Sequence, residues 1–154
     1  MSCILTVSPL VFRPATDADY DNLLALRRAT MEAHLIAAGV EYDDEALRTR
    51  LSYHWEDAAV IVRDGVDVGL LKAYRDADGW FVVQIQIAPE HQRQGLGEQA
   101  LQTVLDRADA EGLPVSLAVL KANPAKRLYD RLGFEVVSEN DIEFLMTRPP
   151  HGAA

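Results

Sequence analysis

The sequence predicts one α/β domain, with a mixed, mostly antiparallel central sheet of about six or seven strands flanked by about four helices. Three observations carry this prediction. The chain has 154 residues, of which 49% are hydrophobic and 25% charged, as in globular domains. Segments with strand periodicity alternate with segments of helical periodicity. Their order is strand, two helices, three strands, helix, strand, helix and two strands. We expect the domain to cover residues 1–148, with 149–154 as a disordered tail.

The first third is predicted to be mostly helical. Residues 11–13 have the character of a strand end, and Thr16, followed three positions later by Asp19, is typical of a helix start. The apolar positions of this helix, before Gly39 ends it, are Leu23, Leu24, Leu26, Met31 and Leu35. A second helix, which begins with acidic residues, is predicted over residues 43–55.

The middle of the chain is predicted to form three strands. Residues 58–63 and 66–74 are rich in apolar and β-branched side chains, and Asp64-Gly65 between them is a hairpin signal. A third strand is predicted over residues 80–88. In it, Phe81, Val83, Ile85 and Ile87 alternate with Val82, Gln84 and Gln86.

The last third is predicted to contain a helix, a strand, a short helix and a hairpin. The helix covers residues 95–112, and its apolar face comprises Leu96, Ala100, Leu101, Val104, Leu105 and Ala108. Residues 115–120 have the composition of a buried strand, and residues 123–132 that of a short capped helix. Residues 134–138 and 142–146 form the closing hairpin.

Composition excludes several classes of protein. A formal charge of −9 argues against binding to nucleic acid or to anionic membranes. Cys3 is the only cysteine, and the four histidines are scattered, so we expect no disulfide framework and no metal site. The first residues lack a basic signal-peptide region, and no apolar run approaches the roughly 20 residues of a membrane span. These features predict a cytoplasmic protein.

The stretch HQRQGLGEQAL, residues 91–101, places two glycines between a strand and a helix. Backbone N–H groups at a helix start bind phosphate when glycine lets the ligand come close, so backbone groups of residues 92–98 could hold a phosphate or pyrophosphate. One alternative is a tight turn with close helix–strand packing. Another is a dinucleotide site, because GLGEQA fits G-x-G-x-x-G/A. However, the next strand is followed by Lys121 instead of an acidic residue, and repeated βαβ units are missing.

A second stretch, KANPAKRLYDRLGF, covers residues 121–134. Its first eleven residues carry a local charge of +3, which a phosphorylated ligand would favour, from Lys121, Lys126, Arg127 and Arg131 against Asp130. The alternatives are a solvated helix face for these cations, a helix N-cap for Asn123 and a core position for Tyr129.

Together the two stretches resemble the GNAT superfamily of N-acetyltransferases. Gln92, Gly95 and Gly97 match its acyl-CoA motif Q/R-x-x-G-x-G/A, directly after a strand. The following N-x-x-A-x-x-L-Y-x-x-x-G-F pattern is matched in outline by Asn123, Leu128-Tyr129 and Gly133-Phe134. The element order also agrees, and the resemblance extends from Val11 to Met146.

The resemblance implies that acetyl-CoA is the acyl donor, with no metal, in a cleft where the strand ending at Ala88 separates from strand 115–120. Tyr129 would give a proton to the leaving thiolate, and one strand N–H would polarise the acetyl carbonyl. Backbone groups of Ile85 and Ile87, near a bulge, would bind the pantetheine arm. The implied cofactor-binding residues are Ile85, Ile87, Ala88, Gln92, Arg93, Gln94, Gly95, Leu96, Gly97, Glu98, Asn123, Lys126 and Tyr129.

Two departures from the family pattern bear on the chemistry. Many members have glycine at the position of Arg93, so the resemblance does not determine the geometry of this loop. Some members carry a glutamate general base on the strand before the motif, where this chain has Gln84 and Gln86. The base is then water or one of Glu32, His34, His54 and Glu56. The cluster Tyr53-His54-Trp55 could grip an acceptor, or Trp55 could pack the second helix on the sheet.

The resemblance implies direct transfer of acetyl to a primary amine of a small-molecule or peptide acceptor, in a ternary complex. The alternative is a non-catalytic acyl-CoA-binding or regulatory module. Propionyl- or succinyl-CoA as donor stays open too, because it depends on the shape of the pocket. The C-terminal strands could leave a sheet edge that pairs in a homodimer.

Overall fold

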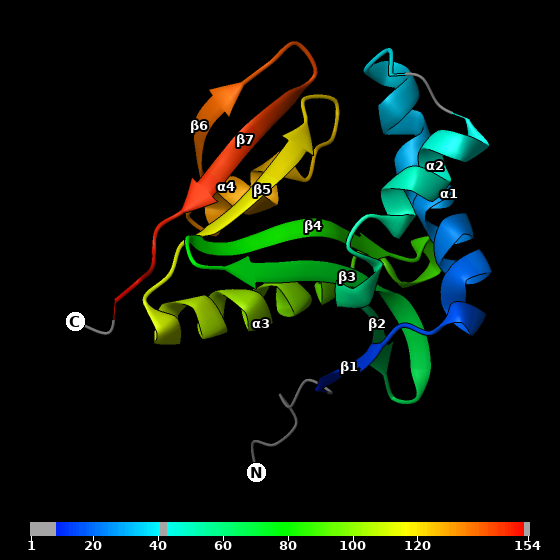
Figure 1. Cartoon of the computed structure of the whole chain (residues 1–154), viewed down its shortest axis with the longest axis horizontal. Helices are drawn as coiled ribbons and strands as arrows, with labels where there is room; N and C mark the ends of the chain where they lie inside the picture. Colours follow the sequence, from blue (N-terminus) through cyan, green and yellow to red (C-terminus); the bar gives the residue numbers. More distant parts are fainter. Residues whose placement is uncertain (1–8, 41–42, 153–154) are drawn as a thin grey trace.

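The computed structural model describes residues 9–40 and 43–152, whose seven strands form one sheet (Figure 1). The strand order is β1-β2-β3-β4-β5-β7-β6, and all pairs are antiparallel except β4 with β5. The strands are β1 (Leu10–Pro14), β2 (Ala58–Arg63), β3 (Val66–Asp76), β4 (Gly79–Ile87), β5 (Val115–Leu120), β6 (Glu135–Glu139) and β7 (Glu143–Arg148). The predicted fold class and element order are therefore confirmed.

Four α-helices flank the sheet: α1 (Tyr20–Ala37), α2 (Asp44–Ser52), α3 (Leu96–Glu111) and α4 (Lys126–Arg131). Helices α1 and α2 pack on one face and α3 on the other, as two neighbours on β2 show. Val60 belongs to a core cluster with residues of α1 and α2, whereas Ile61 belongs to a cluster with residues of α3. Successive strand residues point to opposite faces, so the two clusters lie on opposite sides of the sheet.

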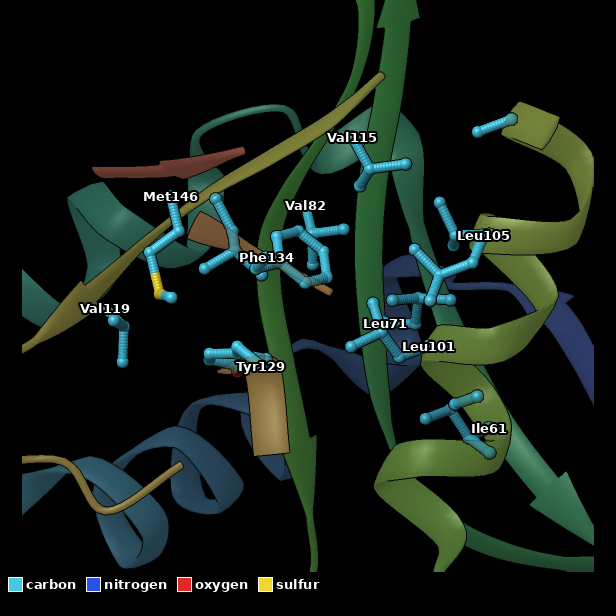
Figure 2. Close-up of a cluster of buried hydrophobic side chains, with 14 of the residues drawn as sticks. Ile61, Leu71, Val82, Leu101, Leu105, Val115, Val119, Tyr129, Phe134 and Met146 are labelled. Carbon is cyan, nitrogen blue, oxygen red and sulfur yellow. The ribbon is translucent and has the colours of Figure 1, made fainter. Parts of the chain in front are cut away.

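The apolar face predicted for α3 is confirmed, since its six predicted residues are the buried residues of the helix. Figure 2 shows Leu101 and Leu105 pointing from α3 toward Ile61 and Leu71 of the sheet. Leu101 has no exposed surface and Leu105 is 1% exposed. At about 25 cal/mol per Å² of buried apolar surface, this helix face is a main source of stability.

The second helix is shorter than the prediction of residues 43–55. Helix α2 ends at Ser52, because Tyr53 is extended and His54 is left-handed with φ of 54°. A short 3-10 turn, η3 (Trp55–Asp57), then leads into β2. The buried ammonium of Lys72 on β3 stabilises this end of α2, since its Nζ donates to the carbonyls of residues 50, 51 and 53 at 3.2, 2.6 and 2.6 Å.

The alternation predicted along residues 80–88 is broken by a β-bulge. Lys72 pairs with Gln84 but Ala73 pairs with Val82, so Val83 is an extra residue on β4. As a result, Val82 packs in the α3 cluster together with Ile85 and Ile87. Gln84 and Gln86 face the side of α1 and α2.

The sheet is divided between β4 and β5. These two parallel strands pair only through Trp80–Val82 and Val115–Leu117, after which β5 leaves β4 at an angle (Figure 1). Beyond the division, β5 pairs with β7 along its whole length and β6 forms the edge. The sheet is therefore open on the carboxyl-terminal side of β4.

The end of the chain lies against α3. Arg148, 4% exposed, donates to both carboxylate oxygens of Asp109 at 2.8 and 3.1 Å, and His151 N donates to Asp109 at 2.8 Å. Residues 149–152 have no helix or strand, and 153–154 lie outside the described residues, so the predicted disorder of 149–154 stays a prediction. Over the described ranges, no helix combines the length and apolar character that crossing a membrane requires.

Candidate active site

A cleft of about 450 Å³ opens where β4 and β5 separate. Its floor is formed by residues 81–86 of β4 and 117–120 of β5. One wall comes from Arg27, Met31 and Leu35 of α1 together with Arg50 and Tyr53, and the other includes Asn123 and Tyr129. The cleft therefore lies at the position where the sequence placed the acyl-CoA site.

The separation leaves backbone groups of β4 facing the cleft. Ala88 N donates to Val68 O at 2.9 Å, so the even-numbered residues here direct their N–H and C=O groups toward β3. The corresponding groups of Ile85 and Ile87 point the other way, into the gap. Gln92 Nε2 donates to Ile87 O at 2.9 Å and occupies that carbonyl. The Ile87 N–H and both groups of Ile85 are then placed for an extended ligand.

The glycine turn between β4 and α3 is open on its outer side. Gly95, the N-cap of α3, has φ of 74°, and a Cβ added there would meet no atom within 4 Å. A Cβ at Gly97 would touch only Ile87 Cγ1, at an ordinary 3.7 Å. Close helix–strand packing, one of the alternatives, therefore does not explain the glycine at position 97. The space beside Gly95 leaves room for a phosphate at the N-terminus of α3, where the first N–H groups of a helix have no intrahelical partner.

The other residues of the turn between β4 and α3 differ in burial and in their partners. Arg93, which replaces the family glycine, adopts the left-handed φ of 66° that glycine favours. Leu96 is 2% exposed and packs in the α3 cluster. Glu98 pairs with Arg131 of α4 at 2.5 Å, whereas the side chains of Gln92 and Gln94 are exposed.

The cationic patch of residues 121–131 is largely neutralised by carboxylates. Lys121 pairs with Glu139 at 2.6 Å, and Lys126 pairs with Asp130 at 2.9 Å. Arg131 is the partner of Glu98. Three of the four cations are thus ion-paired, one of them with the Asp130 that the local charge of +3 already includes, and the use of this patch by a phosphorylated ligand stays a prediction.

Asn123 and Tyr129 both reach the cleft, and both also have structural roles. Asn123 Oδ1 accepts a hydrogen bond from Ala125 N at 2.9 Å at the start of α4. Tyr129 is 8% exposed and packs edge-on against Phe134, with ring centroids 5.8 Å apart (Figure 2). Burial raises the pKa of Tyr129 to about 12, so its phenol keeps its proton at neutral pH.

None of the four side chains considered as general base is among the described lining residues of the cleft, but His54 contacts one of those residues. Its ring stacks on Tyr74, a cleft residue, at 4.0 Å, and its Nδ1 lies 2.9 Å from Asp57 Oδ2. Glu32 is exposed, His34 is absent from the cleft lining, and Glu56 is 73% exposed. His54, Glu56 and Asp57 also bring ligand-type atoms within 4.8 Å of one another.

The aromatic residues of the cluster 53–55 have different positions: one lines the cleft, where it could contact an acceptor, and the other packs in the core. Tyr53 lines the cleft. Trp55 packs edge-on against Tyr20 of α1 at 5.3 Å and contacts the α1–α2 core cluster. Trp55 is therefore structural, as one alternative held.

The sequence did not predict a cluster of three buried polar side chains at the α1–α2 wall of the cleft. Lys72 has no exposed surface, and Arg27 and Gln84 are 8% and 3% exposed. Burial, followed by the charges of Arg50 and Arg27, lowers the pKa of Lys72 to about 8. Both polar atoms of the Gln84 amide are buried without a hydrogen-bond partner among the described residues. The one sequence signal was a lysine within the apolar run of β3.

The site thus combines a split sheet, a glycine turn at the N-terminus of α3 and a buried tyrosine in the cleft, an arrangement that suits an extended, phosphate-bearing ligand. A family model described as the acetyltransferase (GNAT) family matches residues 23–134. The chain belongs to this family, which confirms the resemblance indicated by the two motifs.

Solved structures agree with this assignment. An acetyltransferase from Thermus thermophilus is 25% identical, with a TM-score of 0.72 over 94% of this chain and 99% of that one. PaiA N-acetyltransferase from Thermoplasma acidophilum, in complex with coenzyme A, is 15% identical, with a TM-score of 0.70 over 91% and 98%. N-acetylglutamate synthase from Neisseria gonorrhoeae, complexed with coenzyme A and N-acetyl-glutamate, is 19% identical, with a TM-score of 0.70 over 95% and 36%. The last two likenesses concern the fold.

Proposed function

We propose that the protein transfers acetyl from acetyl-CoA directly to a primary amine of a small-molecule or peptide acceptor. The observation that carries the proposal is the separation of β4 from β5 beside the open N-terminus of α3, with Tyr129 in the same cleft. Two neighbours in fold were solved with coenzyme A, which supports this choice of ligand.

The residues present fit the cofactor. Backbone N–H groups from Gln92 to Glu98 would bind the pyrophosphate, and the open space at Gly95 gives it room. The free backbone groups of Ile85 and Ile87 would bind the pantetheine arm as a neighbouring strand would. Asn123 would help to position it, whereas Lys126 would first have to leave Asp130.

The chain's own groups would then act on both sides of the transferred acetyl. Acetyl-CoA supplies an acyl group already activated as a thioester. A β4 N–H next to the bulge would polarise the carbonyl, which is worth about 3 kcal/mol for one such donor. As the amine nitrogen bonds to carbon and the carbon–sulfur bond breaks, Tyr129 would give its proton to sulfur. The amine proton leaves to the general base or to water.

Removing the Tyr129 hydroxyl tests the proposal. We expect Tyr129→Phe to lower kcat by about tenfold or more with little change in acetyl-CoA affinity. Release of the CoA thiol with an amine panel measures turnover, and titration calorimetry measures affinity. Tyr20→Phe is the control, because that hydroxyl lies outside the cleft and bonds to Arg48 O and Ser52.

The same measurements separate the enzyme from a non-catalytic acyl-CoA-binding module. Binding of acetyl-CoA without release of CoA for any amine would favour the binding module. Failure to bind acetyl-CoA would overturn both. Unchanged turnover in Tyr129→Phe would remove only the acid role assigned to this residue.

A further inference from the structure

The α1–α2 wall of the cleft carries positive charge. Arg27 and Arg50 both line the cleft beside Gln84. The other residues of this wall are Met31, Leu35, Val40 and Tyr53, and the adjoining sheet residues Tyr74 and Phe81 are aromatic. Among the described lining residues, the single carboxylate is Glu143, which belongs to β7 on the opposite side. The described residues of this wall therefore include two cations and no carboxylate among those that line the cleft.

Arg50 is held at the bulge of β4. Its Nη2 donates to the carbonyl of Val83, the bulged residue, at 3.1 Å, and its guanidinium carbon lies 5.7 Å from the Tyr53 ring centroid. Both partners are neutral, and within the described ranges no ion pair joins Arg50 to a carboxylate. The guanidinium thus brings an uncompensated charge, with further donors, next to the position expected for the acetyl group.

Lys72 adds a third cation behind this wall. Its ammonium is buried and held by neutral carbonyls at the end of α2. Burial, followed by the charges of Arg50 and Arg27, lowers the pKa of Lys72, so each arginine repels this ammonium. The acids that act on it in the opposite sense are Glu56 and Asp57, from the η3 turn. An anion in the cleft would relieve this repulsion.

Gln84 supplies the complementary polar group. It lies opposite Lys72 in the sheet register and lines the cleft, and both polar atoms of its buried amide lack a partner in the described structure. An unpaired buried amide is costly, so a ligand that uses it gains affinity. Nε2 can donate to a carboxylate, and Oε1 can accept from an amine.

We propose that the acceptor is a small amino carboxylate, a free amino acid, whose carboxylate binds Arg50 and Arg27 while its amine hydrogen-bonds to Gln84 Oε1. This inference rests on the proposed N-acetyltransferase function and names its substrate class. In the reaction the amine nitrogen forms an amide bond to the acetyl carbon, the carbon–sulfur bond breaks, and CoA leaves as the thiol. A peptide offers the same carboxylate farther from its amine.

Matched acceptors test the carboxylate directly. CoA release is measured with L-leucine, L-leucinamide and 3-methylbutylamine, which share a side chain, and with the corresponding sets for methionine, phenylalanine and glutamate. We expect kcat/KM for at least one amino acid to exceed that of its amide and its decarboxylated amine by about tenfold or more. Leucyl-glycine tests whether the acceptor is a free amino acid or a peptide terminus, because its carboxylate lies farther from its amine. We expect a lower kcat/KM for leucyl-glycine than for L-leucine. Equal or better use of the uncharged or cationic amines overturns the proposal.

Variants of two arginines on α2 assign the preference to Arg50. Arg50→Gln should remove the preference for the carboxylate with unchanged acetyl-CoA affinity, and Arg50→Lys should retain part of it. Arg48→Gln is the control, because Arg48 is 52% exposed and pairs with Asp44. Circular dichroism checks the folding of each variant. A preference that survives in folded Arg50→Gln contradicts the assignment.

The experiment distinguishes failure of this inference from failure of the proposed function. Acetylation of amines without a carboxylate preference overturns the inference and leaves the N-acetyltransferase function intact. Absence of both acetyl-CoA binding and CoA release overturns both. If acetyl-CoA binds but no amine is acetylated, titration calorimetry of the CoA-saturated protein compares its affinity for N-acetyl-L-leucine with its affinity for N-acetyl-L-leucinamide. Selective binding of the carboxylate supports the inference, and equal or no binding refutes it.

Discussion

Arg93 occupies a left-handed conformation that glycine adopts at less cost. Its φ of 66° costs a non-glycine residue roughly 1–2 kcal/mol, and glycine there would lose about 0.4–1 kcal/mol through the unfolded state. We therefore expect Arg93→Gly to raise the free energy of unfolding by about 0.5–1 kcal/mol, measured by urea denaturation.

The neighbouring residue provides the control for this change. Gln94 is outside the group of described non-glycine residues with positive φ, so Gln94→Gly brings the entropic loss without relief of strain. It should lower the free energy of unfolding. The same sign for both variants would show that strain at Arg93 is not the cause.

Single residues of the site differed in how far the sequence could predict them. Gly95 and Tyr129 lie in local motifs, so spacing alone singled them out; the structure places Tyr129 in the cleft and Gly95 at the N-cap of α3. Arg27, Arg50 and Gln84 come from three elements distant in the chain, and no local pattern connects them. Their proximity depends on the packing of α1 and α2 on the sheet, which periodicity does not specify.

At the scale of elements, the interior ammonium of Lys72 joins β3 to the end of α2. Lys72→Met keeps the volume but leaves two carbonyls of the last turn of α2 and that of the following Tyr53 without this donor. We expect the free energy of unfolding to fall by about 2 kcal/mol or more, from urea denaturation monitored by circular dichroism.

Lys121→Met is the matched control for that variant. Lys121 is partly exposed and pairs with Glu139 near the surface, an interaction worth about 1 kcal/mol or less. A loss in Lys72→Met no greater than in Lys121→Met would contradict the role given to the Lys72 ammonium.

Elements with one strong period were predicted well, and elements altered by tertiary contacts were not. Helix α3 has an uninterrupted apolar face, and its buried residues followed from it. The strand β4 contains one bulge at Val83, which reverses the direction of the residues before it relative to simple alternation. The end of α2 was placed too late, because the group that helps to end it, Lys72, comes from another strand.

At the scale of the molecule, Arg148 attaches the end of the chain to α3. Hydrogen bonds from Arg148 hold the pKa of Asp109 below its ordinary value. Asp109→Asn leaves a guanidinium that is 4% exposed without its charged partner, so we expect a loss of about 3 kcal/mol at pH 7. Thermal or urea unfolding measures it.

The pH dependence of this pair has a definite sign. The folded pKa of Asp109 is lower than the unfolded one, so its contribution is complete above about pH 4 and is lost as the pH falls through the folded value. The difference between wild type and Asp109→Asn should therefore shrink in acid. Asp106→Asn, on an exposed part of the same helix, should change stability by about 0.5 kcal/mol or less at any pH. A difference that stays constant into acid would refute the pair's role.

The separation of β4 from β5 has a mechanical consequence. Within the sheet, the four-stranded part and the three-stranded part are joined by the short pairing of residues 80–82 with 115–117. Outside the sheet they share one core, since a single cluster contains Val82 of β4, Val115 of β5, Met146 of β7 and the buried face of α3. The gap is therefore supported from below by packed side chains, so a ligand can enter it without the sheet having to be held open by the ligand itself.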